Sequence, residues 1–142
     1  MIQLDQWVVL PYSVACKLVN LHISPAGVIP QRDRRPRWIY DYTWSGINLS
    51  SLPLSPQDAL QYGRAFDRIT RQILLVDPKH GPVYLLKCDI ADGYYRLGLN
   101  INDIPRLAVA FPTAMQNDPL IALPLVLPMG WKNSGPAFCA AS

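Results

Sequence analysis

The feature that most restricts the fold of this chain is its proline content: 14 of the 142 residues are proline. Proline lacks a backbone donor and breaks the interior of a helix, and within sheets it is confined to edges, strand starts and bulges. Many of these prolines lie near short apolar runs that resemble strands. The pattern therefore argues against an all-helical bundle.

The remaining composition describes one ordered domain, since half of the residues are hydrophobic and the length fits a single unit. The net charge of +3 permits a polyanionic partner without requiring one. The three cysteines are widely spaced and form no CxxC pair, which excludes a zinc ribbon and argues against a disulfide scaffold. We expect an intracellular protein, cytoplasmic or nuclear, with no signal peptide and no transmembrane segment.

A cluster of arginines marks the first clear local pattern. Residues 24–30 and 37–42 contain short apolar runs on either side of a polar turn, which predicts a β-hairpin. The densest positive charge of the chain lies in and beside this turn: Arg32, Arg34, Arg35 and Arg37. Such a cluster is either a solvated hairpin tip or a phosphate-binding site, because the guanidinium fork matches phosphate oxygens. Both interpretations stay open on these residues alone.

The second pattern predicts a helix over residues 55–76. Ser55 and Pro56 suit its first positions, and apolar residues then recur at intervals of three and four. Another face carries Arg64, Arg68 and Arg71. We interpret this face as solvated, with a nucleic-acid-binding stripe as the alternative.

Short apolar runs elsewhere predict strands. They cover residues 83–86, 107–111 and 120–127, with 94–99 as a further strand or a short helix. The first run leads to Asp89, which we interpret as an ordinary residue at the end of a buried strand or as a Mg²⁺ ligand. Cys88 beside it is expected to be a small buried residue, and residues 130–142 predict a loop that opens a helix. Strands and helices do not alternate regularly, so we predict an α+β fold with short antiparallel strands and a few helices.

Taken in order, the segments resemble the reverse transcriptases (RNA-directed DNA polymerases) of retrotransposons. The fingers pattern of that family, S-P-x-x-V-x-P followed by R-x-x-x-D-Y and an asparagine, is matched by residues 24–30, 37–42 and Asn48. The first catalytic motif, an aspartate with an aromatic residue five positions later, is matched by Asp89 and Tyr94.

The second motif of that family, L-P-x-G-[WL]-x-x-[SA]-P, resembles residues 127–138. Met129 stands where the family often has Gln or Phe, and Pro136 comes one position late. The resemblance implies a single partial domain over residues 1–142, an incomplete right-hand polymerase. Its parts would be fingers at about 1–50 and 98–133, palm at 51–97, and the start of a palm helix at 134–142.

The resemblance also implies roles for individual residues. Asp89 would be the catalytic residue and, with the backbone carbonyl of Ile90, would hold Mg²⁺ for two-metal nucleotidyl transfer. The implied nucleotide-binding residues are Arg32, Arg37, Asp92, Gly93, Tyr94, Met129, Gly130 and Lys132. Asp92 and Gly93 would lie under the incoming dNTP, and Tyr94 would exclude a ribose 2′-hydroxyl. The implied macromolecular partner is an RNA or DNA template-primer.

The third motif of the family, Tyr-x-Asp-Asp, has no counterpart here, since the sequence contains no Asp-Asp pair. One carboxylate cannot hold two Mg²⁺ ions against a triphosphate. We therefore expect a truncated polypeptide that is inactive alone and that self-associates through exposed strand edges. The alternatives are a retained non-catalytic domain that binds nucleic acid or protein through its arginines, and an α+β domain with an unrelated role.

Overall fold

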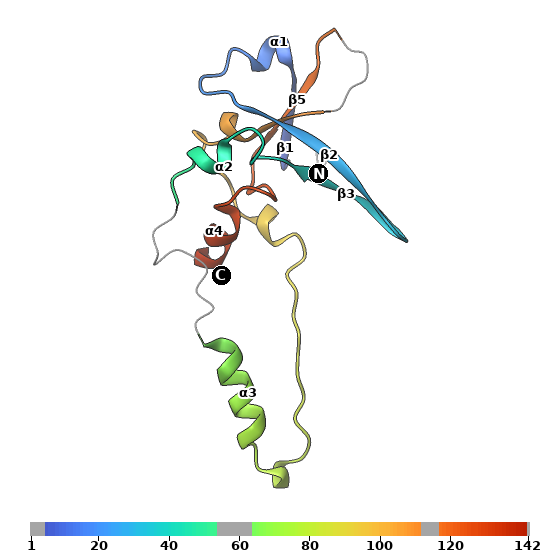
Figure 1. Ribbon diagram of the computed structural model, residues 1–142, viewed down its shortest axis with the longest axis vertical. Coiled ribbons are helices and arrows are strands. Elements are labelled where there is room, and N and C mark those ends of the chain that lie inside the picture. The colour runs from blue at the N-terminus through green and yellow to red at the C-terminus, as the bar shows by residue number, and fades with distance from the viewer. Residues whose placement is uncertain (1–4, 54–63, 112–116, 142) are drawn as a thin grey trace.

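The computed structural model describes residues 5–53, 64–111 and 117–141, and its centre is a five-stranded sheet (Figure 1). The strands are β1 (Trp7–Pro11), β2 (Ile23–Gln31), β3 (Arg34–Tyr40), β4 (Ala108–Ala110) and β5 (Leu120–Pro124). The α-helices are α1 (Tyr12–Ala15), α2 (Ile47–Ser50), α3 (Ala65–Leu75) and α4 (Ser134–Ala141), and 3-10 turns cover Pro78–His80, Gly93–Arg96 and Pro105–Leu107. The described residues form a mixed α+β fold, as the sequence predicts.

The hairpin predicted around the arginines is confirmed as β2 and β3. Val28 pairs with Trp38 in antiparallel register, and a bulge shifts the register before the tip. At the tip Asp33 has a left-handed φ of 59°, a conformation that Asp and Asn adopt more readily than most residues. The hairpin projects beyond the other strands (Figure 1).

Segments far apart in the sequence complete the sheet, which has the order β1-β5-β4-β2-β3. β5 pairs antiparallel with both β1 and β4, whereas β2 pairs parallel with β4. The expectation of antiparallel strands is therefore wrong at the β2–β4 pair, where the long connection leaves room for the crossover that parallel strands require. β1 lies in residues 1–23, where the sequence shows no clear period.

The core has one cluster on each face of the sheet, because neighbouring residues of β4 and β5 point to opposite faces. One cluster comprises Trp7, Tyr40, Tyr42, Ile47, Leu107, Val109 and Ala122, and the other comprises Ala15, Ala108, Ile121 and Leu123. The hydroxyl of Tyr42 donates to the carbonyl oxygen of Leu107 at 3.0 Å inside the first cluster. Burial raises the pKa of Tyr42, and charge repulsion from the phenol groups of Tyr40 and Tyr95 adds to this shift.

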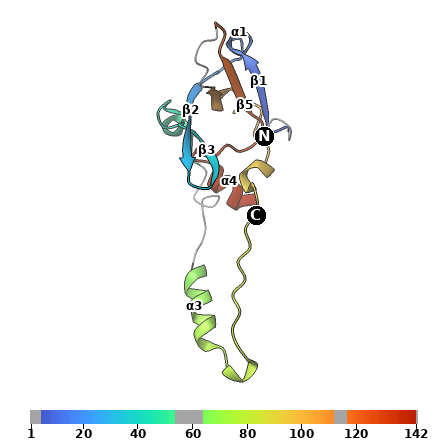
Figure 2. The same ribbon diagram turned by 90° about the vertical axis from the view of Figure 1, so that its right-hand side faces the viewer.

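Residues 64–90, here called the arm, extend away from the sheet (Figures 1 and 2). Within the arm, α3 confirms the described part of the predicted helix; its predicted start at Ser55 and Pro56 lies outside the described residues. The strand predicted over 83–86 is wrong, since residues 81–90 have no regular secondary structure. A strand needs a neighbour for its backbone groups, and no described residue pairs with this segment.

The remaining predictions of secondary structure are confirmed in their main features. The runs 107–111 and 120–127 contain β4 and β5, and β5 ends at Pro124. The segment after Asp92 is the short helix of the two alternatives, the 3-10 turn Gly93–Arg96. A loop leads into α4, as expected for residues 130–142. Among the helices of the described ranges, none is long and apolar enough to span a membrane.

Candidate functional site

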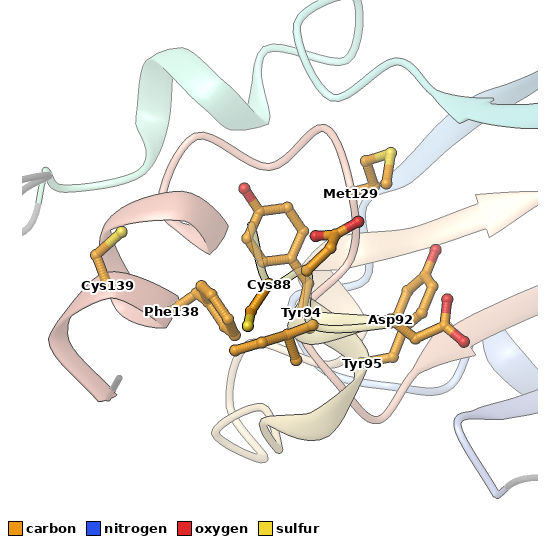
Figure 3. A pocket seen from close by; sticks show the side chains of 10 residues that line it. Cys88, Asp92, Tyr94, Tyr95, Met129, Phe138 and Cys139 are labelled. Carbon is orange, nitrogen blue, oxygen red and sulfur yellow. The ribbon is translucent and has the colours of Figure 1, made fainter. Parts of the chain in front are cut away.

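A cleft of about 580 Å³ brings together six of the residues implied by the resemblance. They are Asp89, Ile90, Asp92, Gly93, Tyr94 and Met129. The lining is completed by four further residues, Cys88, Tyr95, Phe138 and Cys139, the last two from α4 (Figure 3). The cleft therefore forms where the end of the arm meets the Gly93–Arg96 turn, the loop before α4, and α4 itself.

The turn that presents Tyr94 is fixed by its own hydrogen bonds. Asp92 adopts a left-handed φ of 54°, and its carbonyl oxygen accepts from the backbone N–H of Tyr95 at 2.9 Å. Nε of Arg96 donates to the carbonyl of Ala91 at 3.0 Å, which closes the turn from its other end. Just beyond, an antiparallel bridge between Gly98 and Val126 attaches the turn to the chain that follows β5.

Helix α4 supplies the aromatic wall of the cleft. Phe138 meets Tyr94 edge to face, with ring centroids 5.5 Å apart and planes at 85°, a favourable arrangement for two aromatic rings (Figure 3). Gly93 makes this approach possible, because a Cβ at that position would lie 2.9 Å from the ring of Phe138. Close packing against α4 therefore explains why position 93 is a glycine.

Two carboxylates line the cleft, Asp89 and Asp92, and both residues are exposed. Burial raises the pKa of Tyr95, and the charge of Asp92 adds to this shift. The expected buried strand before Asp89 is wrong, and Cys88 is exposed rather than buried. Both corrections have the same cause, since the segment that carries these residues has no strand partner among the described residues.

The side chains available as ligands limit which metal sites the cleft can form. Within the described residues, no group of three or more His, Cys, Asp or Glu side chains comes together to hold a metal ion. Mg²⁺ needs six oxygen ligands and is commonly held by one or two carboxylates together with substrate phosphates and waters. Among the described residues, the cleft lining thus offers two carboxylates, Asp89 and Asp92, and no all-protein metal site.

The other four residues implied by the resemblance lie outside the cleft lining. Arg32 and Arg37 are exposed on the β2–β3 hairpin, and Lys132 is exposed in the loop before α4. Gly130 lies in the same loop with φ +98°, and a Cβ there would lie 2.8 Å from the carbonyl oxygen of Tyr40. The structure gathers the first-motif residues with Met129 and leaves the basic residues outside the cleft lining.

Four lining residues had no role in the sequence interpretation: Cys88, Tyr95, Phe138 and Cys139. Their place in the site comes from tertiary contacts, which local periodicity does not report. For Phe138 the sequence offers one indication of a place in the site, because this residue lies one turn into the helix predicted after Gly130.

Comparison of the chain with protein-family models gives no match, and comparison with curated proteins gives none either. The functional interpretation therefore depends on the order of the motifs and on the cleft.

Proposed function

We propose that this chain is the fingers and an incomplete palm of a reverse-transcriptase-like retrotransposon polymerase, and that its cleft takes a nucleotide together with Mg²⁺. The observation that carries the proposal is the convergence of two motifs on one surface. Asp89 and Tyr94 belong to the first motif and Met129 belongs to the second, and all three line the same cleft. Motif order alone selected these residues, so their proximity is independent support.

The chemistry of the lining suits a nucleotide. The rings of Tyr94, Tyr95 and Phe138 offer flat surfaces for a base or sugar. Asp89 would hold Mg²⁺ through its carboxylate, with Asp92 and the carbonyl of Ile90 as further oxygen donors. When bound, the ion would neutralise and polarise phosphate oxygens. These protein groups would bind and orient the nucleotide.

We expect these 142 residues to lack polymerase activity on their own. Two-metal nucleotidyl transfer requires carboxylates that hold both ions, and the sequence has no Asp-Asp pair to add to Asp89. A primer-extension assay with template-primer, the four dNTPs and Mg²⁺ should therefore yield no product. Extension that requires Asp89 would contradict this expectation.

Calorimetric titration of the chain with a dNTP, with and without Mg²⁺, tests the binding itself. We expect Mg²⁺-dependent binding that Asp89→Asn weakens about tenfold or more, since a charge-assisted contact to the ion is lost. Asp67→Asn is the matched control, because Asp67 lies on α3 outside the cleft. Binding that ignores both Mg²⁺ and Asp89→Asn would overturn the proposal.

One observation favours a second candidate, a non-catalytic nucleic-acid-binding domain. Five arginines of the hairpin and the arm are exposed in the structure: Arg32, Arg37, Arg64, Arg68 and Arg71. Affinity for single-stranded RNA should then fall steeply with salt, and Arg68→Gln with Arg71→Gln should reduce the logarithmic salt slope by about 1.4. Arg106→Gln is the control, since Arg106 pairs with Asp103 at 3.8 Å outside this surface. An unchanged slope in the double variant would exclude the arm as the binding surface.

A further inference from the structure

The loop that carries the second motif is held by the segment around α2. Four hydrogen bonds, here called the α2 clasp, join residues 48–52 to residues 130–133. Asn48 Nδ2 donates to the Gly130 carbonyl (3.1 Å) and Lys132 N–H donates to Asn48 Oδ1 (2.9 Å). Trp131 Nε1 donates to Ser51 Oγ (3.0 Å) and Asn133 Nδ2 donates to the Leu52 carbonyl (2.8 Å). Two segments distant in sequence are thereby fixed side by side.

Asn48 is the centre of the clasp. Its carboxamide donates to the Gly130 carbonyl and accepts from the Lys132 N–H, so that it holds both residues of the loop. Its Nδ2 also donates to Thr43 Oγ1 at 3.0 Å. Its backbone N–H donates to the carbonyl of Tyr42, at the end of the hairpin segment. A carboxamide offers a donor and an acceptor on one planar group, which neither a carboxylate nor a hydroxyl of similar reach reproduces.

The loop that Asn48 holds needs such a restraint. Gly130 has a φ of +98°, and the position of its absent Cβ lies 2.8 Å from the carbonyl oxygen of Tyr40. The loop therefore passes directly over the end of β3 in a conformation that is accessible to glycine. The bond from Asn48 to the Gly130 carbonyl fixes the loop in that conformation.

The same loop determines where two walls of the cleft stand. Met129, which lines the cleft, directly precedes Gly130. Ser134 begins α4; its Oγ donates to the Pro128 carbonyl at 2.6 Å and its N–H donates to the Trp131 carbonyl at 3.0 Å. Phe138 follows one turn later and meets Tyr94. A shift of the loop would consequently move Met129 and the α4 wall together.

We propose that Asn48 is a positioning residue for the cleft: its carboxamide holds residues 130–132 so that Met129 keeps its place in the lining and Phe138 faces Tyr94. The inference deepens the proposed function and depends on it for the identity of the ligand. Asn48 also connects the loop to the hairpin that carries the arginines, because its backbone N–H donates a hydrogen bond to the carbonyl of Tyr42, just after β3.

Three variants test this role. Asn48→Ala removes both loop bonds, whereas Asn48→Asp keeps an acceptor for the Lys132 N–H and loses the donor to Gly130. Asn100→Ala is the matched control, since Asn100 Oδ1 accepts from the Asn102 N–H at 3.0 Å within its own turn. Three measurements apply to each variant: hydrogen exchange at the Lys132 amide, the nuclear Overhauser effect between the rings of Tyr94 and Phe138, and dNTP affinity with Mg²⁺.

For Asn48→Ala we expect about tenfold faster exchange at the Lys132 amide, a weakened Tyr94–Phe138 effect and about tenfold weaker dNTP binding. Asn48→Asp should keep the Lys132 amide close to its original protection, and Asn100→Ala should change none of the three. Slow hydrogen exchange at the amides of β4 and β5 shows that a variant is folded. If Asn48→Ala is not folded by this criterion, the nuclear Overhauser effect between Tyr94 and Phe138 in Asn48→Asp tests the inference instead.

The outcomes separate this inference from the proposed function. If the parent chain binds no dNTP, the proposed function fails, and the exchange and ring measurements still report on Asn48. If Asn48→Ala exposes the Lys132 amide but leaves the Tyr94–Phe138 effect and the dNTP affinity unchanged, Asn48 does not position the cleft and the inference is wrong.

Discussion

The sheet body and the arm contain similar apolar side chains in different surroundings. In the body, Leu107 and Tyr42 are 1% and 0% exposed. In the arm, Leu86 and Tyr84 are 89% and 85% exposed, and α3 has no buried residue. Residue type is therefore not what separates the two regions. Every strand of the body pairs with another strand, and β1, β2, β4 and β5 each have a partner from a distant part of the chain, whereas no described element covers the arm.

This difference shows what an amphipathic pattern does and does not specify. The spacing of Phe66, Ile69 and Ile73 is enough to define the apolar face of α3, yet all three side chains are exposed. Helices of this length are marginal in water without tertiary packing. The arm therefore presents an apolar surface that no described element covers, and we expect any self-association of the chain to cover it.

The largest expected effect is on the state of association. Replacing Leu85 and Leu86 by lysine should convert associated chains to monomers, because two of the most exposed apolar side chains of the arm become charged. Sedimentation velocity over a range of concentrations measures the change. Val19→Lys is the control, since Val19 is 80% exposed outside the arm. Association that survives the double substitution would show that Leu85 and Leu86 do not form the contact.

The next effect is on the free energy of unfolding. Leu107→Ala should cost about 2–5 kcal/mol, because it leaves a cavity in the buried cluster. Leu86→Ala, the same chemical change in the arm, should cost less than about 0.5 kcal/mol. Urea unfolding followed at a concentration where the chain is monomeric measures both. Equal costs would mean that the arm is packed in solution.

A glycine from each region gives a sharper comparison. Gly130 and Gly81 both have positive φ, at +98° and +93°, but a Cβ meets the Tyr40 carbonyl at 2.8 Å only in the first case; at Gly81 nothing lies within 4 Å. Gly130→Ala should cost about 1–3 kcal/mol, and Gly81→Ala should cost less because its surroundings can relax. Thermal melting checks the order, and a larger loss for Gly81→Ala would reverse the interpretation.

The sequence predicts an element of the fold reliably only where the residues that specify it lie close together in the chain. The β2–β3 hairpin was predictable because both strands and the turn lie within a few residues of one another. The run 83–86 resembles a strand as closely as β4 does, but a run of β-forming residues does not reveal whether a neighbour is present. β1 was missed for the converse reason, since its partner β5 is distant in sequence.

The candidate site divides in the same way. Motif spacing identified Asp89, Tyr94 and Met129, which line one cleft. It did not identify Phe138 as the wall against Tyr94 or assign Asn48 a contact with the loop, because both depend on tertiary packing. It also placed Arg37 in the same site, and the structure has that residue exposed on the hairpin, outside the cleft.

A smaller effect is expected from a single buried hydroxyl. Tyr42→Phe removes the donor to the Leu107 carbonyl and leaves that acceptor buried, which should cost about 1 kcal/mol. Tyr84→Phe removes the same hydroxyl from an exposed position in the arm and should leave the free energy of unfolding unchanged. Chemical denaturation of both variants tests the pair. A neutral Tyr42→Phe would show that the hydrogen bond adds nothing to the stability of the body.

The smallest expected effect lies at the edge of the body and depends on pH. The hydroxyl of Ser13 donates to Asp118 Oδ2 at 2.6 Å and its N–H donates to Oδ1 at 2.9 Å. These bonds, the hydroxyl first, lower the pKa of Asp118. The folded-state pKa thus lies below the unfolded value of about 3.9, so the stabilisation is present above that value and is lost as the pH falls through the folded pKa.

Ser13→Ala should therefore lower the melting temperature slightly at about pH 7, and the difference from the parent chain should shrink as the pH falls below about 3.9. The effect is small because Asp118 lies at the surface, where water screens the charge of its carboxylate. Ser50→Ala is the control, since the hydroxyl of Ser50 donates to the Ile47 carbonyl and has no carboxylate partner. A Ser13→Ala difference that stays constant over this pH range would show that the hydroxyl acts through packing and not through the charge of Asp118.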